Sequence, residues 1–229
     1  YNSVRGAKVI AFARDLLDQS IPLVAASWTE VRGFAITDGA LEVKTSSTIT
    51  SLLDASQFVG HTGQANMPKS IIMKQSGLHL EIIINENGTI GSNDRAHIDD
   101  VILESALTSI IDLEDSIAAV DAEDKVLAYR NWHQVMCGTL TAEFNKNGKT
   151  MTRALNADKH YVAADGSKSI LRGRALMLVR NVGHLMTNPS ILLSDGSEIP
   201  EGILDAFVSV AAALPDMSSK MNSSAGSIY

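Results

Sequence analysis

Three carboxylates, Asp112, Glu114 and Asp115, follow directly after an apolar run of the sequence. A charged side chain is costly to bury, so acids at this position indicate the mouth of a site and not the interior of a core. In an extended chain Asp112 and Glu114 point to the same side, so both would face one cavity. Clustered carboxylates suit a divalent cation such as Mg²⁺, either as direct ligands or as acceptors for its bound waters. The alternative interpretation is a solvated strand end followed by a helix N-cap.

A second apolar run ends in a permanently charged residue, Arg180. Its guanidinium offers a planar fork of donors that suits a carboxylate, or an oxyanion that develops during a reaction. The alternative is a structural arginine that pairs with the acids after the first run. The spacing does not separate these interpretations, and both can hold at once.

Other residues with reactive side chains have simpler structural explanations. His184 is best interpreted as a hydrogen-bonded residue near a strand end, and Cys137 as a small packed residue on an amphipathic helix. The segment "NDRAHIDD", residues 93–100, has Asp and His at ligand-like spacings, but a helix cap with a solvated first turn is the better prediction. The GxGxxG, P-loop, HExxH and GxSxG patterns do not occur in the sequence.

Two segments of similar design must position the acids and the arginine: "LTSIIDLED", residues 107–115, and "ALMLVRN", residues 175–181. Each is an apolar run followed by charge, a loop and eventually a helix. A continuous apolar run is typical of a strand that is buried on both faces of a parallel sheet. In such folds the chemistry lies at the carboxyl ends of the strands. We therefore expect the two charged ends to meet at one pocket.

The remaining elements follow from periodicity and turn residues. Helices are predicted over residues 5–18, 121–144 and 201–213. The first is amphipathic, with Val9, Ala13 and Leu16 on one face and Ile10 and Leu17 beside them. Most of the sequence between the first two helices, and again after the second, indicates β structure. Turns are predicted at Asp38-Gly39, Ser76-Gly77, Asn87-Gly88, Asn147-Gly148 and Asp165-Gly166.

The composition is that of a soluble globular protein. The 229 residues are 45% hydrophobic and 20% charged, and the net charge of −7 argues against a nucleic-acid partner. No apolar run approaches the roughly 18–20 residues that span a bilayer, and the first residues lack the layout of a signal peptide. The single cysteine excludes an internal disulfide and fits a reducing compartment, so we expect a cytoplasmic protein without a membrane partner.

Several longer stretches carry a resemblance to one family. "IIDLEDSIAAVDAEDKVLAYRNW" and "RGRALMLVRNVGHLM", together with "QFVGHTG", "NADKHYVAADG" and "SEIPEGILDAF", closely resemble the malate synthase G family. The resemblance implies an α/β (α+β) fold: a β-rich insertion domain with hairpins, plus two strands and helices of an incomplete TIM barrel. Because the chain begins without a methionine and a whole barrel needs roughly 250 residues, we expect a central excerpt.

The same resemblance implies a division of the chain. The insertion domain would comprise residues 1–95, mostly β, and a second β-rich part at residues 145–173. Residues 96–144 and 174–229 would each supply a barrel strand and a helix.

The resemblance further implies an acyltransferase that condenses acetyl-CoA with glyoxylate in a Claisen-type reaction, hydrolyses malyl-CoA to malate and CoA, and uses Mg²⁺. Arg180 matches the arginine that contacts glyoxylate and stabilises the enolate of acetyl-CoA. Asp112 and Glu114 match carboxylates that hold the waters of the metal, and Ser116 and Arg153 match positions that contact acetyl-CoA. In that family the direct metal ligands and the catalytic base come later in the sequence, beyond this chain.

Two other functions fit part of the sequence. A citrate-lyase-type or malyl-CoA lyase barrel has a similar "LEDS" strand end, although it generally lacks a long β-rich insertion. A packing or binding module without catalysis is the second alternative. We expect the isolated chain to be inactive and to self-associate through its exposed barrel strands, whereas the parent enzyme is expected to be a monomer.

Overall fold

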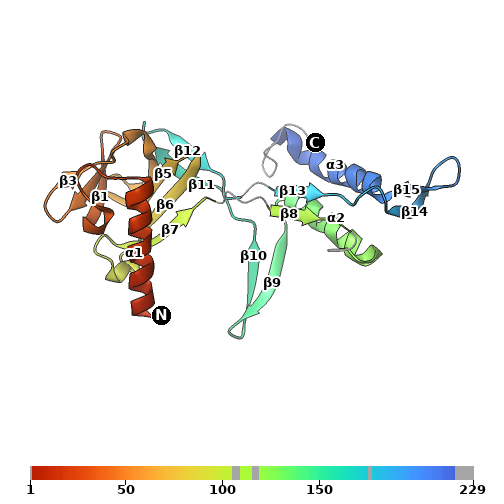
Figure 1. Cartoon of the computed structure of the whole chain (residues 1–229), viewed down its shortest axis with the longest axis horizontal. Helices are drawn as coiled ribbons and strands as arrows, with labels where there is room; N and C mark the ends of the chain where they lie inside the picture. Colours follow the sequence, from red (N-terminus) through yellow and green to blue (C-terminus); the bar gives the residue numbers. More distant parts are fainter. Residues whose placement is uncertain (1, 105–108, 115–118, 175–176, 220–229) are drawn as a thin grey trace. The chain divides into compact units, whose positions relative to one another are not determined.

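A computed structural model describes residues 2–104, 109–114, 119–174 and 177–219 of the chain. It divides into two compact units, and the polypeptide passes between them three times (Figure 1). The first unit comprises Tyr1–Ala106 and Asp158–Arg172, and the second comprises Leu107–Ala157 and Gly173–Tyr229. The predicted division at residues 95, 144 and 173 differs from these units at two places, because residues 96–106 lie in the first unit and residues 145–157 in the second.

The first unit is built mainly of antiparallel strands, as the turn residues predict. Its larger sheet has six strands in the order β12-β11-β4-β5-β6-β7, and its smaller sheet has the order β1-β2-β3. The bounds are β1 Val31–Thr37, β2 Ala40–Thr45, β3 Ile49–Thr50, β4 Phe58–Gln64, β5 Met67–Gln75, β6 Leu78–Ile84, β7 Ile98–Leu103, β11 Lys159–Ala163 and β12 Lys168–Leu171. Helix α1 (Ser3–Ser20) and the short 3-10 helices η1 (Trp28–Glu30), η2 (Ala55–Gln57) and η3 (Gly91–Asn93) complete the unit.

Two hairpin turns of this unit have the geometry that their sequences predict. Asp38 and Gly39, between β1 and β2, have φ values of 51° and 79°. Ser76 and Gly77, between β5 and β6, have φ values of 50° and 84°. Two successive positive φ angles form the tight turn whose twist matches that of paired strands, and Asp and Gly tolerate them best. These predicted hairpins are confirmed.

The core of the first unit lies between α1 and the sheets. Trp28, Leu17 and Ile71 are completely buried in it. The predicted apolar face of α1 is only partly covered, because Val9 on that face is 62% exposed. Arg14, on the same helix, is buried instead, and its guanidinium forms an ion pair with Asp94 in the loop before β7.

The segment predicted as a helix cap and first turn forms a strand instead. Residues 98–103 are β7, which pairs with β6 at the edge of the six-stranded sheet. Asp94 does act as a local cap, because its Oδ1 accepts hydrogen bonds from the backbone N–H groups of Ala96 and Ile98 at 2.9 and 3.0 Å. An aspartate that satisfies the backbone two and four residues later supports a turn as well as a helix start, so the pattern was ambiguous.

The second unit holds the two predicted charged strand ends. Strands β8 (Ser109–Asp112) and β13 (Met177–Arg180) form a parallel pair, as predicted, with helices α2 (Ala122–Cys137) and α3 (Glu201–Ser219) packed together beside them. Two hairpins complete the unit: β9 (Thr141–Lys146) with β10 (Lys149–Ala154), and β14 (Thr187–Leu192) with β15 (Glu198–Pro200). No described helix is long and apolar enough to cross a membrane.

Among the described residues, one face of the parallel pair is packed and the other is open. Met177 and Val179 pack against the apolar cluster of α2 and α3, which includes Trp132. On the other face Ile110 is 57% and Leu178 is 52% exposed. The expectation that both strands are buried on both faces is therefore wrong for this chain, since the two helices supply a single apolar surface.

Helix α2 is shorter than predicted. It ends at Cys137, where Gly138 adopts a left-handed conformation with φ 69° and donates its N–H to the carbonyls of Gln134 and Val135. Glycine at this position is the usual helix stop. Phe144, which continued the apolar periodicity, therefore lies on strand β9 instead.

Candidate functional site

The parallel register brings the two predicted charged ends together. Asp112 is the last residue of β8 and Arg180 the last residue of β13, and the two stand opposite each other in the ladder. The backbone N–H of Leu113 donates to the carbonyl of Arg180 at 2.9 Å, so the strands stay paired up to this point. Both side chains therefore leave the sheet at its carboxyl edge.

Asp112 and Arg180 form a two-pronged ion pair. Nε of Arg180 donates to Oδ1 of Asp112 at 2.9 Å, and Nη2 donates to Oδ2 at 2.6 Å. This parallel arrangement fixes the plane of the guanidinium as well as its distance. The side chains are 24% and 47% exposed, respectively, so the arginine remains accessible to a ligand.

The chain turns immediately after the pair. Oδ1 of Asp112 also accepts the backbone N–H of Glu114 at 3.0 Å, which is a turn closed by an aspartate side chain. Regular strand geometry ends at Asp112. The extended spacing that predicted a common direction for Asp112 and Glu114 therefore does not continue to Glu114.

Electrostatics keep both members of the pair charged. The hydrogen bond from Arg180 lowers the pKa of Asp112, burial opposes this, and the Glu114 N–H and the charges of Arg180 and Lys125 lower it further. Reciprocally, the hydrogen bond to Asp112 raises the pKa of Arg180. At neutral pH the site therefore presents a fixed guanidinium beside an ionised carboxylate.

The arginine keeps donors for a second anion. Its contacts with described residues use two of the five guanidinium N–H groups. The remaining donors suit a planar carboxylate or an oxyanion placed at the exposed side of the fork. The arrangement can therefore bind and polarise an oxygen-bearing substrate while Asp112 holds the fork in place.

The carboxylates fit the outer shell of a cation better than its inner shell. Asp112 accepts three hydrogen bonds within the described residues, which leaves about one of its four lone-pair positions for another donor. In that part of the chain no three His, Cys, Asp or Glu side chains gather as a ligand set. A carboxylate with one open position suits a metal-bound water more than direct coordination.

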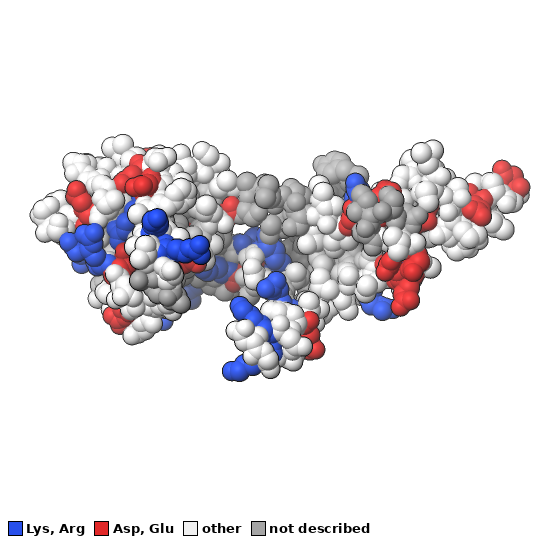
Figure 2. Space-filling model, turned by 60° about the horizontal axis from the view of Figure 1, so that its bottom comes forward, with Lys and Arg blue, Asp and Glu red and all other residues white. Residues whose placement is uncertain are grey.

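Of the other predicted site residues, only Arg153 lies among the described residues, and no described contact links it to this pair. Ser116, like Asp115, lies outside the described residues. Arg153 stands on strand β10 and is exposed, and its guanidinium lies 5.0 Å from the ring centroid of Phe144 on β9. The hairpin comes forward in Figure 2, where basic side chains gather on it. Arg153 is thus a cation held on an aromatic ring and open to solvent.

Sequence reasoning missed four polar residues behind the pair. Lys125 and Tyr129 come from α2, and Glu201 and Asp205 come from α3. They are linked by hydrogen bonds and ion pairs, and Asp205 is completely buried. The available signal was an Asp one helical turn after Glu201 within an apolar helix, where a charge needs a partner.

Cys137 and His184 take no part in the Asp112–Arg180 pair through any described contact. Cys137, predicted to be packed and without a neighbouring histidine, is exposed, and its Sγ lies 3.6 Å from Nε2 of His133, one turn earlier on α2. His184 is exposed, and no described contact links it to Arg180.

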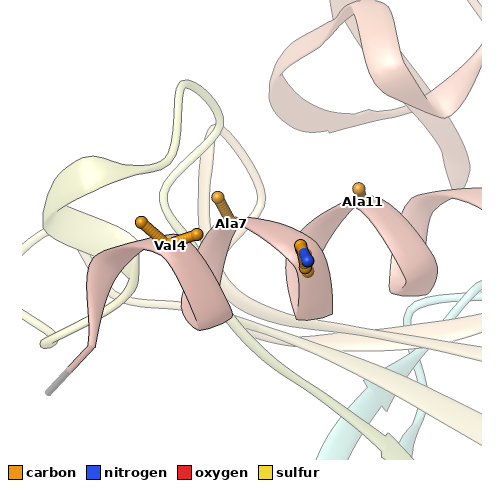
Figure 3. A pocket seen from close by; sticks show the side chains of 4 residues that line it. Val4, Ala7 and Ala11 are labelled. Carbon is orange, nitrogen blue, oxygen red and sulfur yellow. The ribbon is translucent and has the colours of Figure 1, made fainter.

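Two other hollows among the described residues lie along helix α1. Figure 3 shows Val4, Ala7 and Ala11 pointing from one side of α1, where with Lys8 they line an open apolar hollow. A second cavity, of 190 Å³, lies between α1 and β7 and is lined mainly by apolar side chains. The strand ends therefore remain the better candidate site.

Comparison with known proteins points to a single family. Residues 1–75 match the family model of the malate synthase G alpha-beta insertion domain. Over its whole length the chain is similar to malate synthase G of Corynebacterium efficiens, Halalkalibacterium halodurans and Corynebacterium glutamicum, with 48%, 50% and 46% identity. It covers 31%, 32% and 31% of these proteins, so the chain spans about a third of the length of the curated relatives it matches. The resemblance to malate synthase G is thereby confirmed.

Proposed function

We propose that this chain forms part of a malate synthase G that condenses acetyl-CoA with glyoxylate and hydrolyses malyl-CoA to malate and CoA. The observation that carries the proposal is the two-pronged Asp112–Arg180 pair at the carboxyl ends of two parallel strands. This is the edge at which α/β enzymes place their chemistry. The identity of 46–50% with malate synthase G along the whole chain supports the same reading.

In this function Arg180 binds the substrate oxygens. Its outward donors would hold the carboxylate of glyoxylate and stabilise the enolate oxygen that forms when acetyl-CoA loses a methyl proton. Asp112 keeps the guanidinium plane fixed, so no reorientation is needed while charge develops. The base that removes the proton is expected in a part of the enzyme beyond this chain.

The expected metal is Mg²⁺, held by direct ligands outside this chain. Asp112 and Glu114 would accept hydrogen bonds from its waters, in keeping with the single open position on Asp112. When bound, the cation would act as a Lewis acid toward the aldehyde oxygen of glyoxylate.

Acetyl-CoA is expected to use Ser116 and Arg153. An exposed arginine whose guanidinium lies over the Phe144 ring suits the phosphate groups of CoA, because no described hydrogen bond uses its side-chain donors. Lys146 and Lys149 on the same hairpin add to the positive potential that would attract a polyanionic substrate. The free thiol of Cys137 fits a reducing compartment, so the expected location remains the cytoplasm.

The proposal is tested by replacing Arg180 with lysine in the full-length protein. We expect the rate of malate formation from acetyl-CoA and glyoxylate to fall at least about 100-fold, because an ammonium lacks the planar fork. Arg130→Lys, an exposed arginine on α2, is the matched control and should retain full activity. An unchanged rate in Arg180→Lys would assign the arginine to structure alone.

Product analysis separates the enzyme alternatives. Free malate and CoA indicate a synthase, whereas reversible cleavage of malyl-CoA without net hydrolysis indicates a lyase. The isolated 229-residue chain should release no CoA in the same assay.

A further inference from the structure

We propose that Lys125 and Asp205 are positioning residues, which act on the reaction by holding the backbone just beyond Asp112 and Arg180. The inference rests on the proposed function, because it assigns their role to the same site. Neither residue needs to contact a substrate. Their effect would pass through the two strand ends.

Lys125 fixes the first strand end. Its Nζ donates to the carbonyl oxygen of Leu113 at 2.6 Å, and Leu113 directly follows Asp112. The other contacts of Nζ are with Glu201 at 2.7 Å and Asp205 at 3.2 Å. Three oxygens thus surround the ammonium group, and those of Leu113 and Asp205 accept hydrogen bonds from it. Since the Lys125 side chain is only 9% exposed, water competes little for them.

Asp205 fixes the second strand end. Its Oδ2 accepts the backbone N–H of Val182 at 2.9 Å, and Val182 lies two residues after Arg180. The same oxygen accepts a hydrogen bond from Nζ of Lys125, and Oδ1 accepts one from the hydroxyl of Tyr129. One buried carboxylate therefore joins α2, α3 and the chain after β13. Burial, and then the hydrogen bond to Asp205, raise the pKa of Tyr129, so the phenol stays a donor at any working pH.

Stability alone is a poor reason for this network. Replacing a buried ion pair with well-packed apolar residues is often neutral or stabilising, so such pairs are weak evidence for stability. Here Lys125 and Asp205 each form a hydrogen bond with the backbone next to the Asp112–Arg180 pair. These two hydrogen bonds hold the backbone beside Asp112 and Arg180 in place, whereas apolar side chains could not bond to it.

The double variant Lys125→Met/Asp205→Leu separates position from stability. It removes both charges of the Lys125–Asp205 pair and keeps a similar volume, but it leaves Glu201 without its lysine, so folding is verified before rates are compared. In the full-length enzyme, kcat/KM for glyoxylate should fall about 10- to 100-fold, since small displacements of binding groups are enough for such losses. The KM for acetyl-CoA should stay within about twofold. A general loss of folded protein would lower kcat and leave both KM values unchanged.

Repeating the double replacement in an Arg180→Lys enzyme shows whether the loss of kcat/KM depends on the position of Arg180. In Arg180→Lys the same double replacement should lower kcat/KM by about threefold or less, because the positioned fork is already gone. Asp216→Asn, another buried acid on α3, is the matched control and should leave activity unchanged. An equal loss in both backgrounds, or no loss in the first, would overturn the inference.

Backbone exchange gives a readout that does not depend on activity. The Val182 amide should exchange with solvent at least about tenfold faster in the double variant and unchanged in Asp216→Asn. If the unmodified enzyme forms no malate, the proposed function fails and this measurement alone decides the positioning role. If the double variant does not fold, Tyr129→Phe replaces it, with an expected loss of about threefold that disappears in Arg180→Lys. An additive loss would count against the inference.

Discussion

Replacing Asp94 by asparagine removes the negative charge from a buried ion pair in the first unit. Oδ2 of Asp94 accepts Nη2 of Arg14 at 2.6 Å, and the two side chains are 5% and 7% exposed. Arg14 also donates to the carbonyl of Trp28, and Oδ1 of Asp94 accepts two backbone N–H groups. The pair thus ties α1 to the loop that leads into β7.

The expected cost follows from leaving one buried charge without its partner. An asparagine can keep both backbone hydrogen bonds, but its amide nitrogen would face the Arg14 guanidinium, donor against donor. Removing one member of a buried pair typically costs about 3–5 kcal/mol. Arg14→Met should cost a similar amount, and the double variant should cost about 2 kcal/mol less than the sum, since neither charge is then stranded.

The loss should depend on pH in a direction set by Asp94. Burial alone would raise its pKa, but the hydrogen bond from Arg14 and those from Ile98 and Ala96 outweigh burial, so the net pKa is lowered. A carboxyl with a lowered folded pKa contributes its full stability above its unfolded pKa of about 3.9, and loses it as the pH falls further. The difference between the natural chain and Asp94→Asn should be constant above about pH 5 and shrink below about pH 4.

The two tryptophans provide the assay. Trp28 is buried in the first unit and Trp132 lies in the second, so a Trp132→Phe background makes fluorescence report the first unit alone. Urea unfolding is then followed in this background with and without Asp94→Asn. Arg5→Met, an exposed arginine on the same helix, is the control and should change stability by no more than about 0.5 kcal/mol.

Two results would refute the reasoning. The first is a loss below about 1 kcal/mol for Asp94→Asn at pH 7, which would mean that solvent compensates the stranded arginine. The second is additivity of Arg14→Met and Asp94→Asn, which would mean that the two groups do not interact.

Three further outcomes are expected. In the full-length enzyme Arg153→Met should raise KM for acetyl-CoA about 3- to 10-fold and leave KM for glyoxylate unchanged, as measured by initial rates. Gly60→Ala should destabilise the first unit by about 1–3 kcal/mol in urea unfolding, because the added Cβ would overlap the carbonyl oxygen of Val162. The isolated chain should self-associate in light scattering, and Ile110→Glu with Leu178→Glu should restore a monomer, since both side chains are exposed on the open strand face.

Local features were predictable where two neighbouring residues decide the conformation. The turns at Asp38-Gly39 and Ser76-Gly77 follow from the tolerance of these residues for positive φ, whatever the rest of the chain does. The end of α2 was equally local but was overlooked, because the apolar periodicity past Gly138 concealed a helix stop. The exposure of Val9 was not predictable, since helical periodicity identifies an apolar stripe but not whether another element packs against it.

The pairing of Asp112 with Arg180 was predictable because apolar runs that end in charge favour adjacent parallel strands. The network behind it was not, because Lys125 and Asp205 are 80 residues apart and meet only through the packing of α2 against α3. No spacing rule connects them. Only the high cost of burying Asp205 alone indicated that a partner must exist.

Exposure favours the proposed substrate-binding role of Arg180 over a purely structural one. A purely structural arginine is expected to be buried with its donors satisfied, as Arg14 is at 7% exposure. Arg180 is 47% exposed and makes its described contacts through one edge of the fork. The fully buried Asp205 lies behind it instead, with its oxygens taken by protein donors. The second unit thus places fixed charges inside and an oriented, accessible guanidinium at the edge, and this separation is what an arginine that binds a substrate oxygen requires.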